Sequence, residues 1–341
     1  MALITAHFDV SGIDFLIKKT KKNTEFFNFP YVYTKGIFGN QCDQKQFYSN
    51  IVEKVMSDRE IKNPSCDVLT CGFPDSPELN LKTKYSVKTL DLIESSEGIV
   101  PVFINNKVFL TKGMMCSYEL DEDEDFLGNE NDLGEFDQIA NLNAYPQTTP
   151  DDLSSQVSLD SKICEKIPER FRFESGRKIV FTGGRFTQKI LNPELNYILI
   201  LEALRGLGVF NVYLDSSNAY SLLRTVQMYD RSLVPDIESF FDTSGFFIRT
   251  GGSCECLINN GLGDDKFIEI EDNKVFIYPF RSDTPARLSI KSRELGTIDV
   301  HTNGGSLGIV FDTRAPGDSI YDDVKLLNES VKQFENVLKD R

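Results

Sequence analysis

The sequence has no tryptophan, only two histidines and no long apolar run. No stretch reaches the ~18–20 apolar residues that a membrane-spanning helix needs, so we expect no transmembrane segment. The N-terminus lacks a basic segment ahead of an apolar one, which argues against a signal peptide. The seven cysteines are scattered and odd in number. They predict reduced thiols and a cytoplasmic location, and they exclude a secreted disulfide scaffold.

Basic residues are missing from one stretch of the chain. The sequence has 37 Lys and Arg against 52 Asp and Glu, for a net charge of −15. Between residues 113 and 161 there are 13 acidic residues and no basic one, while the remaining 39 acidic and 37 basic residues nearly balance. A strongly anionic protein repels phosphate backbones, so we expect no nucleic-acid partner.

The acidic stretch also contains a partial calcium-loop pattern. Asp121, Asp123 and Asp125 alternate like the first ligands of such a loop, but Phe126 stands where its sharp turn requires glycine. We interpret the stretch as an acidic insertion or linker. A calcium loop and a partner-binding segment are the alternatives.

The rest of the chain shows a mixed α/β pattern. Apolar runs predict a buried strand at 3–9 and two parallel strands at 178–182 and 210–214, joined by an apolar helix over 193–204. Short β-like runs separated by turns between 246 and 311 predict a small β domain, a meander or barrel, before an amphipathic terminal helix.

The first candidate site is a diglycine bend at the end of a strand. Thr182 is followed by Gly183, Gly184 and Arg185, and Asp215 ends the next strand. Glycines at such a point let backbone N–H groups approach a phosphate or a ring closely. The likeness to a dinucleotide site is weak because the third glycine is missing. A tight strand-to-helix turn that needs positive φ explains the glycines equally well.

The second candidate site is the turn after the first strand. Asp9 ends that strand, and Ser11 and Gly12 follow it. An acid at this place, followed by Ser-Gly, can position a metal-bound water beneath a phosphate. A polar β-turn closed by an Asx hydrogen bond is the structural alternative.

A third pattern lies near the C-terminus. Asp312 and Arg314 lie on the same side of a strand, which predicts a salt bridge or a hydrogen-bonded corner. Cys254 and Cys256 form a lone close pair, which is more typical of inert thiols than of metal ligands.

The second half of the chain resembles a known family. The segment 182–186, the apolar helix at 199–204 and the strand ending at Asp215 are similar to the MutL family associated with glutamate mutase, which is distinct from the mismatch-repair protein of that name. The most specific part is a glycine-bounded strand pair at 296–314 that ends in an Asp-x-Arg turn. Ala315 stands where the family has glycine.

The resemblance covers residues 178–340 and implies membership of the actin-like ATPase superfamily. It implies an actin-like (ribonuclease H-like) core that holds ATP and Mg²⁺ between two lobes, and an association with the repair or activation of a cobalamin mutase. Such an ATPase uses two phosphate loops. The middle of the chain shows a hairpin pattern about Asn105 and Asn106 but no acid-x-Gly-Gly turn. We therefore expect a degenerate nucleotide pocket.

These patterns, together with what the resemblance implies, predict an α/β protein in four segments. They are an N-terminal actin-like lobe at 1–112, the acidic insertion or linker at 113–161, a second α/β lobe at 162–245, and a C-terminal small β domain with the terminal helix at 246–341. ATP and Mg²⁺ are the expected cofactors, with Asp9 as the metal residue. The expected cofactor contacts are Asp9, Ser11, Gly12, Thr182, Gly183, Gly184, Arg185 and Asp215.

Three functions remain open at this point. The first is an actin-like scaffold or regulatory protein that acts through a protein partner, with at most weak ATPase activity. The second is a working ATPase of the chaperone or reactivase type, in which Asp9 holds Mg²⁺-bound water and the diglycine bend flanks adenine. The third and weakest is a Rossmann-like NAD-binding enzyme.

Overall fold

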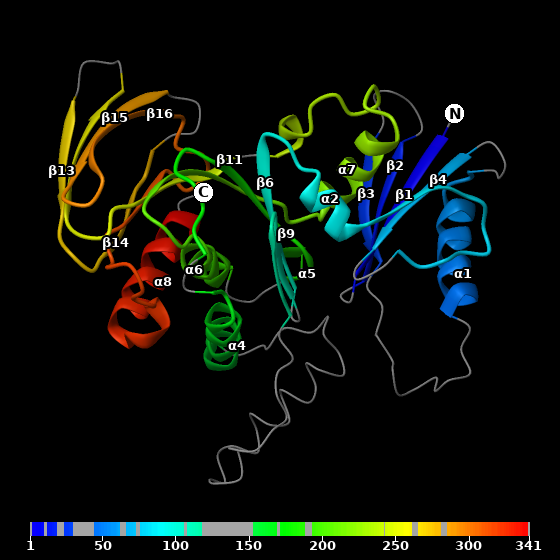
Figure 1. Cartoon of the computed structure of the whole chain (residues 1–341), viewed down its shortest axis with the longest axis horizontal. Helices are drawn as coiled ribbons and strands as arrows, with labels where there is room; N and C mark the ends of the chain where they lie inside the picture. The colour runs from blue at the N-terminus through cyan, green and yellow to red at the C-terminus, as the bar shows by residue number, and fades with distance from the viewer. Residues whose placement is uncertain are drawn as a thin grey trace, which may run out of the picture.

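The fold comprises two mixed β-sheets, each flanked by helices, and a smaller antiparallel sheet (Figure 1). The computed structural model describes residues 2–9, 12–18, 24–29, 44–61, 66–72, 76–105, 108–117, 153–168, 171–187, 193–241, 243–260, 265–280 and 285–339. No helix in these ranges is long and apolar enough to cross a membrane. The described cysteines are free thiols, as expected: Cys66, Cys71, Cys116, Cys164, Cys254 and Cys256.

The first sheet has five strands in the order β3-β2-β1-β4-β5. They are β1 (Ala2–Asp9), β2 (Gly12–Lys18), β3 (Thr24–Phe29), β4 (Cys66–Gly72) and β5 (Thr83–Lys88). β1 is antiparallel to β2 and parallel to β4. The helix α1 (Gln44–Asp58) packs on one face of this sheet through a core that includes Val52 and Ile4. The short helix α2 (Thr89–Glu94) follows β5.

The second sheet repeats the same order in its strands β8-β7-β6-β9-β10. They are β6 (Ile99–Ile104), β7 (Val108–Thr111), β8 (Met114–Ser117), β9 (Lys178–Thr182) and β10 (Gly208–Leu214). β6 is antiparallel to β7 and parallel to β9, so β6 corresponds to β1 of the first sheet. Three more strands extend this sheet beyond β10: β11 (Thr243–Arg249), β17 (Ile309–Asp312) and β14 (Val275–Tyr278).

Helices cover the second sheet and join it to the first. They are α4 (Leu153–Glu165), α5 (Gly184–Thr187), α6 (Glu194–Ala203), α7 (Ala219–Tyr229) and α8 (Val324–Lys339), with short 3₁₀ turns η2 (Glu238–Phe240) and η3 (Ile320–Asp322). Although α7 follows β10, it packs against β1, β2 and β4. One core holds Leu3 and Leu69 of the first sheet, Val180 of the second sheet and Leu222 of α7. The two sheets are therefore packed together through α7.

The third sheet is antiparallel, with the order β13-β12-β15-β16. Its strands are β12 (Cys254–Asn259), β13 (Lys266–Ile270), β15 (Ala286–Ser292) and β16 (Gly296–Thr302). It lies at the opposite end of the molecule from β1 (Figure 1). The sequence predicted a small C-terminal β domain within 246–341, whereas β11, β14 and β17 belong to the second sheet. Continuous apolar runs such as Phe246–Ile248 suit a strand buried on both faces, whereas β12 alternates buried and exposed residues.

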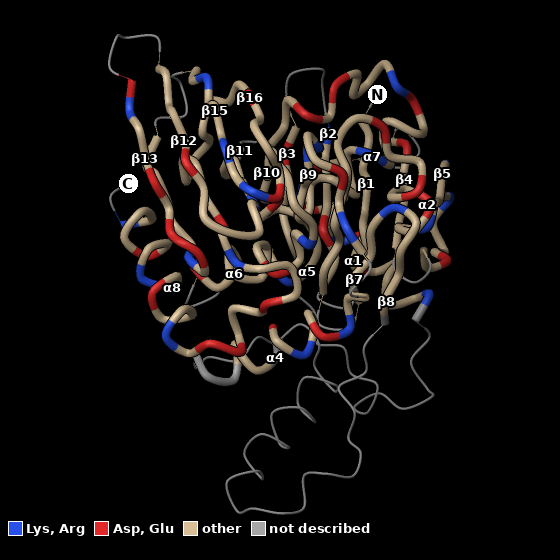
Figure 2. The backbone as a smooth tube through the Cα atoms, turned by 60° about the vertical axis from the view of Figure 1, so that its left-hand side comes forward, with Lys and Arg blue, Asp and Glu red and all other residues tan. Residues whose placement is uncertain are grey.

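The strands also place the lobe boundary differently from the sequence analysis. β6 and β7 lie before residue 113 but belong to the second sheet, so the first lobe ends near Gly98. Residues 153–161 of the predicted acidic insertion lie in α4, which packs against α6. The calcium-loop pattern at 121–126 lies outside the described residues. Figure 2 shows basic and acidic residues interspersed along the described chain, as the near balance outside 113–161 predicts.

Candidate functional site

The candidate site lies where the first hairpin of each large sheet turns. Asp9 is the last residue of β1, and Asn105 follows the last residue of β6. The Asn105 Nδ2 donates a hydrogen bond to Asp9 Oδ1 at 3.0 Å, and both residues are buried, with 2% and 1% exposed. Asn105 Oδ1 accepts from the Val108 backbone N–H at 2.9 Å, which holds the second turn closed. The two turns therefore face each other and bind through their side chains.

The second turn is the structural counterpart of the first. The β6–β7 hairpin occupies the same place in the second sheet as the β1–β2 hairpin in the first. The sequence predicts a hairpin about Asn105 and Asn106 but has no acid-x-Gly-Gly turn there. The second turn carries Asn105, Asn106 and Lys107 instead. The second turn is thus present in the fold, but it lacks the acidic residue and the glycines of an acid-x-Gly-Gly phosphate loop.

The diglycine bend lies directly against the second turn. Gly183 has φ +108°, and a Cβ at this position would lie 2.4 Å from the Ile104 carbonyl oxygen. The glycine is therefore required both by its backbone conformation and by the close approach of β6. Because Ile104 immediately precedes Asn105, the structure brings the predicted first turn and the predicted bend to one place. Both Gly183 and Gly184 are buried.

A buried polar network joins this place to α7. Across the β1–β2 ladder His7 faces Asp14, with 3.4 Å between His7 Nδ1 and Asp14 Oδ2. Asn218, before α7, donates through Nδ2 to Asp14 Oδ2 at 2.6 Å, and His7 Nε2 lies 3.1 Å from Thr89 Oγ1. The Asn218 Oδ1 lies 2.9 Å from Thr182 Oγ1 of the second sheet. The network thus links both sheets. Pairing 3–9 with 12–18 as an antiparallel hairpin places His7 opposite Asp14, so the sequence could have revealed the contact between these two residues.

Several solved structures resemble this chain at low sequence identity. No family model and no curated protein matches it. The activator of 2-hydroxyisocaproyl-CoA dehydratase from Clostridium difficile, solved with ADPNP, is 9% identical with a TM-score of 0.39, covering 68% of this chain and 96% of that chain. Component A of (R)-2-hydroxyglutaryl-CoA dehydratase from Acidaminococcus fermentans is 10% identical with a TM-score of 0.37, covering 66% and 96%. The Ppx/GppA phosphatase of Aquifex aeolicus is 11% identical with a TM-score of 0.27, covering 62% and 76%.

The strand order decides the fold at these low TM-scores. Both large sheets have the order 3-2-1-4-5 with an antiparallel second strand, which is the ribonuclease H-like arrangement, and their first hairpins face each other. The fold is actin-like. The predicted actin-like core is thereby confirmed, and the narrower resemblance to the MutL-like family stays a prediction.

Asp215 anchors a helix of the actin-like core. Its carboxylate accepts from the backbone N–H groups of Ala219 at 2.9 Å and Tyr220 at 2.8 Å, at the start of α7. The Ser217 backbone N–H lies 3.2 Å from Asp215 Oδ1, and Thr182 Oγ1 donates to Oδ2 at 2.9 Å. Burial raises the pKa of Asp215, and these hydrogen bonds oppose the rise. The acceptor atoms of Asp215 are therefore occupied by its own fold.

Arg185 also has a structural partner. Its guanidinium binds Asp160 of α4, with Nη2 2.7 Å from Oδ2 and Nε 3.1 Å from Oδ1, and both side chains are fully buried. Burial raises the pKa of Asp160, and Arg185 opposes the rise. The sequence analysis counted Asp160 within the acidic insertion. Its position on a helix that packs against the core could not be inferred from charge alone.

The described side chains at the two turns are bound within the fold. Asp9 is buried and bound to Asn105, and Gly12 pairs with Asp9 across the hairpin. Ser11 lies outside the described residues. Within the described ranges no group of three His, Cys, Asp or Glu side chains could hold a metal ion. The assignment of nucleotide contacts to these residues remains a prediction.

Proposed function

We propose that this chain is an actin-like scaffold or regulatory protein with a degenerate nucleotide pocket, acting through a protein partner. The hydrogen bond between Asp9 Oδ1 and Asn105 Nδ2, at 3.0 Å and buried, carries the proposal. Phosphoryl transfer depends on groups positioned around the phosphates and their Mg²⁺. Here the side chains at the two facing turns are bound to each other, and Asp215 and Arg185 are bound within the fold.

The third sheet supports the part of the proposal that concerns a protein partner. Leu257 of β12 and Phe267 of β13 lie opposite each other in the ladder, with 40% and 56% of their surfaces exposed. β13 is also the edge strand of that sheet. Exposed apolar pairs and edge strands are typical of surfaces that bind other proteins.

The test is a thermal-shift titration with Mg-ATP, Mg-ADP and NAD, paired with an ATP turnover assay. A ligand at 100 times its Kd stabilises the folded state by about 2.7 kcal/mol, which is readily measured. We expect no shift and no turnover with any of the three. A shift with Mg-ATP that Asp9→Ala removes and the exposed control Asp58→Ala keeps would contradict the degenerate pocket.

One observation favours the alternative, an ATPase of the chaperone or reactivase type. The bend at Gly183 and the first turn at Asp9 meet at one place, as that function requires. Under this alternative, Mg-ATP stabilises the protein and Asp9→Ala abolishes turnover. Stabilisation by NAD(H) without an effect of ATP would instead support the NAD-binding enzyme.

A further inference from the structure

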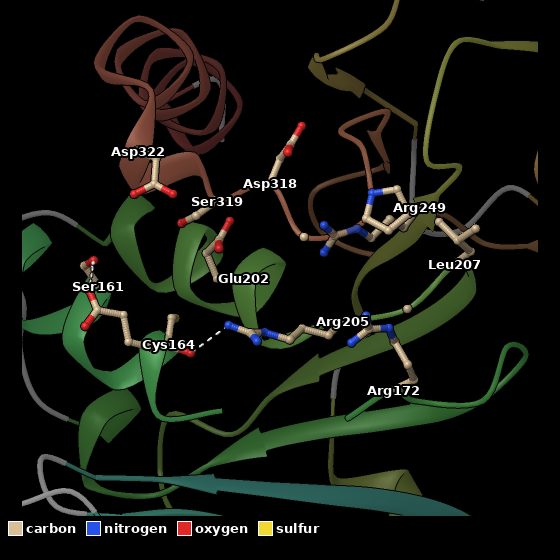
Figure 3. A pocket seen from close by; sticks show the side chains of 14 residues that line it. Ser161, Cys164, Arg172, Glu202, Arg205, Leu207, Arg249, Asp318, Ser319 and Asp322 are labelled. Atoms are coloured by element: carbon tan, nitrogen blue, oxygen red, sulfur yellow. Dashed lines mark hydrogen bonds between the residues drawn. The ribbon is translucent and has the colours of Figure 1, made fainter. Parts of the chain in front are cut away.

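A pocket of about 470 Å³ lies outside the junction of the two large sheets. It is bounded by the C-terminal ends of α4 and α6, the end of β11 and the segment 316–322 (Figure 3). It shares no residue with the Asp9, Asn105 and Gly183 site. Its volume lies in the range of ~300–1,000 Å³ that is typical of small-molecule sites.

The buried wall of the pocket contains an arginine with few hydrogen bonds. Arg249 is only 6% exposed, and its Nη1 donates to the Leu204 carbonyl at 3.3 Å. Its Nε lies 3.7 Å from Asp312 Oδ2 and has no hydrogen-bond partner among the described residues. The Asp312 carboxylate is already held by Arg314, at 2.8 Å from Nε and 2.7 Å from Nη2. A guanidinium has five donors, so the hydrogen-bonding capacity of Arg249 is largely unused.

Two further arginines lie on the same side of the pocket. Arg205 donates to the carbonyls of Cys164 at 2.7 Å and Ile167 at 2.8 Å, which fixes its guanidinium in the wall. Arg172 lies beside it at the exposed rim (Figure 3). The three cations of this side come from three different parts of the chain, and together they favour an anionic group.

The opposite side of the pocket is acidic. Figure 3 shows Asp322, Ser319 and Asp318 across the pocket from Arg205 and Arg172. Glu165 also lines the pocket. The Glu202 carboxylate at the base is already bound to Arg314 and to the Ile320 backbone N–H. The charge of the lining is therefore divided between carboxylates, of which Glu165 accepts a hydrogen bond from Ser161 at 3.3 Å, and guanidinium groups.

We propose that this pocket binds a small zwitterion, with its carboxylate or phosphate at Arg249, Arg205 and Arg172 and its ammonium at the acidic side. Such a ligand matches both charged sides at once, and its anionic group is placed to accept from the Nη donors of Arg249, because Nε is enclosed against Asp312. A simple anion matches one side only and is repelled by the other. Cys164 lines the pocket without a covalent role, because burial and the nearby Glu202 raise the pKa of its thiol far above the ordinary value.

The test is calorimetric titration of the full chain with two matched series of probes. The first series is 4-aminobutyrate, butyrate and butylamine, and the second is phosphoethanolamine, inorganic phosphate and ethanolamine. We expect the zwitterion of at least one series to bind about tenfold more tightly than its singly charged relatives. The series that binds distinguishes a carboxylate ligand from a phosphate ligand.

Two exposed arginines provide matched variants that leave the core intact. Arg172→Gln is expected to weaken binding of the zwitterion about tenfold, whereas Arg177→Gln, five residues away and outside the pocket, leaves it unchanged. Absence of binding by both zwitterions at about 10 mM would overturn the proposal. Equal effects of the two variants, or binding by the singly charged probes as tight as by the zwitterions, would overturn it as well.

Discussion

At the scale of single residues, the buried pair of Asp160 and Arg185 is expected to have a large effect on stability. Both side chains are fully buried and bound at 2.7 Å. Asp160→Asn leaves the guanidinium charge buried without a counter-charge, so we expect the free energy of unfolding to fall by about 3–5 kcal/mol. Denaturant unfolding measures the loss.

Two comparisons separate the charge from the packing. The exposed pair of Lys54 and Asp58 on α1 is the control, and Asp58→Asn is expected to cost less than about 1 kcal/mol. Replacing both members of the buried pair, as Asp160→Leu with Arg185→Met, removes the two charges together and should recover most of the stability. If Asp160→Asn were as mild as Asp58→Asn, the pair would not be formed in solution.

The lowered pKa of Asp312 predicts that its contribution to the free energy of unfolding decreases toward low pH. Burial alone would raise the pKa of Asp312, but Arg314 and Arg249 hold it below the ordinary value of 3.8. Its contribution to stability is therefore present above pH 3.8 and is lost as the pH falls through the lowered pKa. The stability difference between wild type and Asp312→Asn should shrink as the pH is lowered in this range. Denaturant unfolding at a series of pH values measures it, and a difference that grows toward low pH would contradict the assignment.

At the scale of elements, the bend between β9 and α5 depends on Gly183. Gly183→Ala places a Cβ 2.4 Å from the Ile104 carbonyl oxygen in a backbone with φ +108°. Gly176 is a matched control, because it has φ +85° with nothing within 4 Å of its Cβ position. The positive φ alone costs about 1–2 kcal/mol, so Gly176→Ala measures that cost. We expect Gly183→Ala to lower the midpoint of thermal unfolding further, and equal effects would show that the contact with β6 is not needed.

The elements also show what could be predicted from the sequence and what could not. Apolar runs predicted β9, α6 and β10 because each is buried on most of its surface and needs no distant partner to be recognised. The Asp312 and Arg314 corner was predicted and is confirmed, because the two residues are only two positions apart in the chain, with Asp312 the last residue of β17 and Arg314 just beyond it. Asn105 was missed as part of the site because its partner, Asp9, is 96 residues away. Contacts at such separation are set by the sheet order, which the local pattern does not contain.

At the scale of the whole molecule, the two large sheets share a core and a polar network. Leu3 and Leu69 of the first sheet pack in one cluster with Val180 of the second sheet and Leu222 of α7. Asn218 binds Asp14 on one side and lies 2.9 Å from Thr182 on the other. A shared core makes separate unfolding of the two halves unfavourable, since either half alone would expose apolar surface to water. The sequence predicted two lobes, divided at 112 and 161, and their joint packing through α7 is a contact between distant segments that local patterns do not contain.

We therefore expect the two halves of the actin-like core to unfold in one transition. The chain has no tryptophan, so a single introduced tryptophan reports on its own surroundings alone. Phe27→Trp places the probe on β3 of the first sheet, and Phe276→Trp places it on β14 of the second, both at half-buried positions. Fluorescence curves of the two variants in denaturant should have the same shape and each should coincide with that variant's circular dichroism curve. The contradicting result is a fluorescence change of the Phe27→Trp variant at a lower denaturant concentration than the change in its circular dichroism. The first sheet would then unfold on its own, because the packing of α7 across both sheets would be too weak to join them.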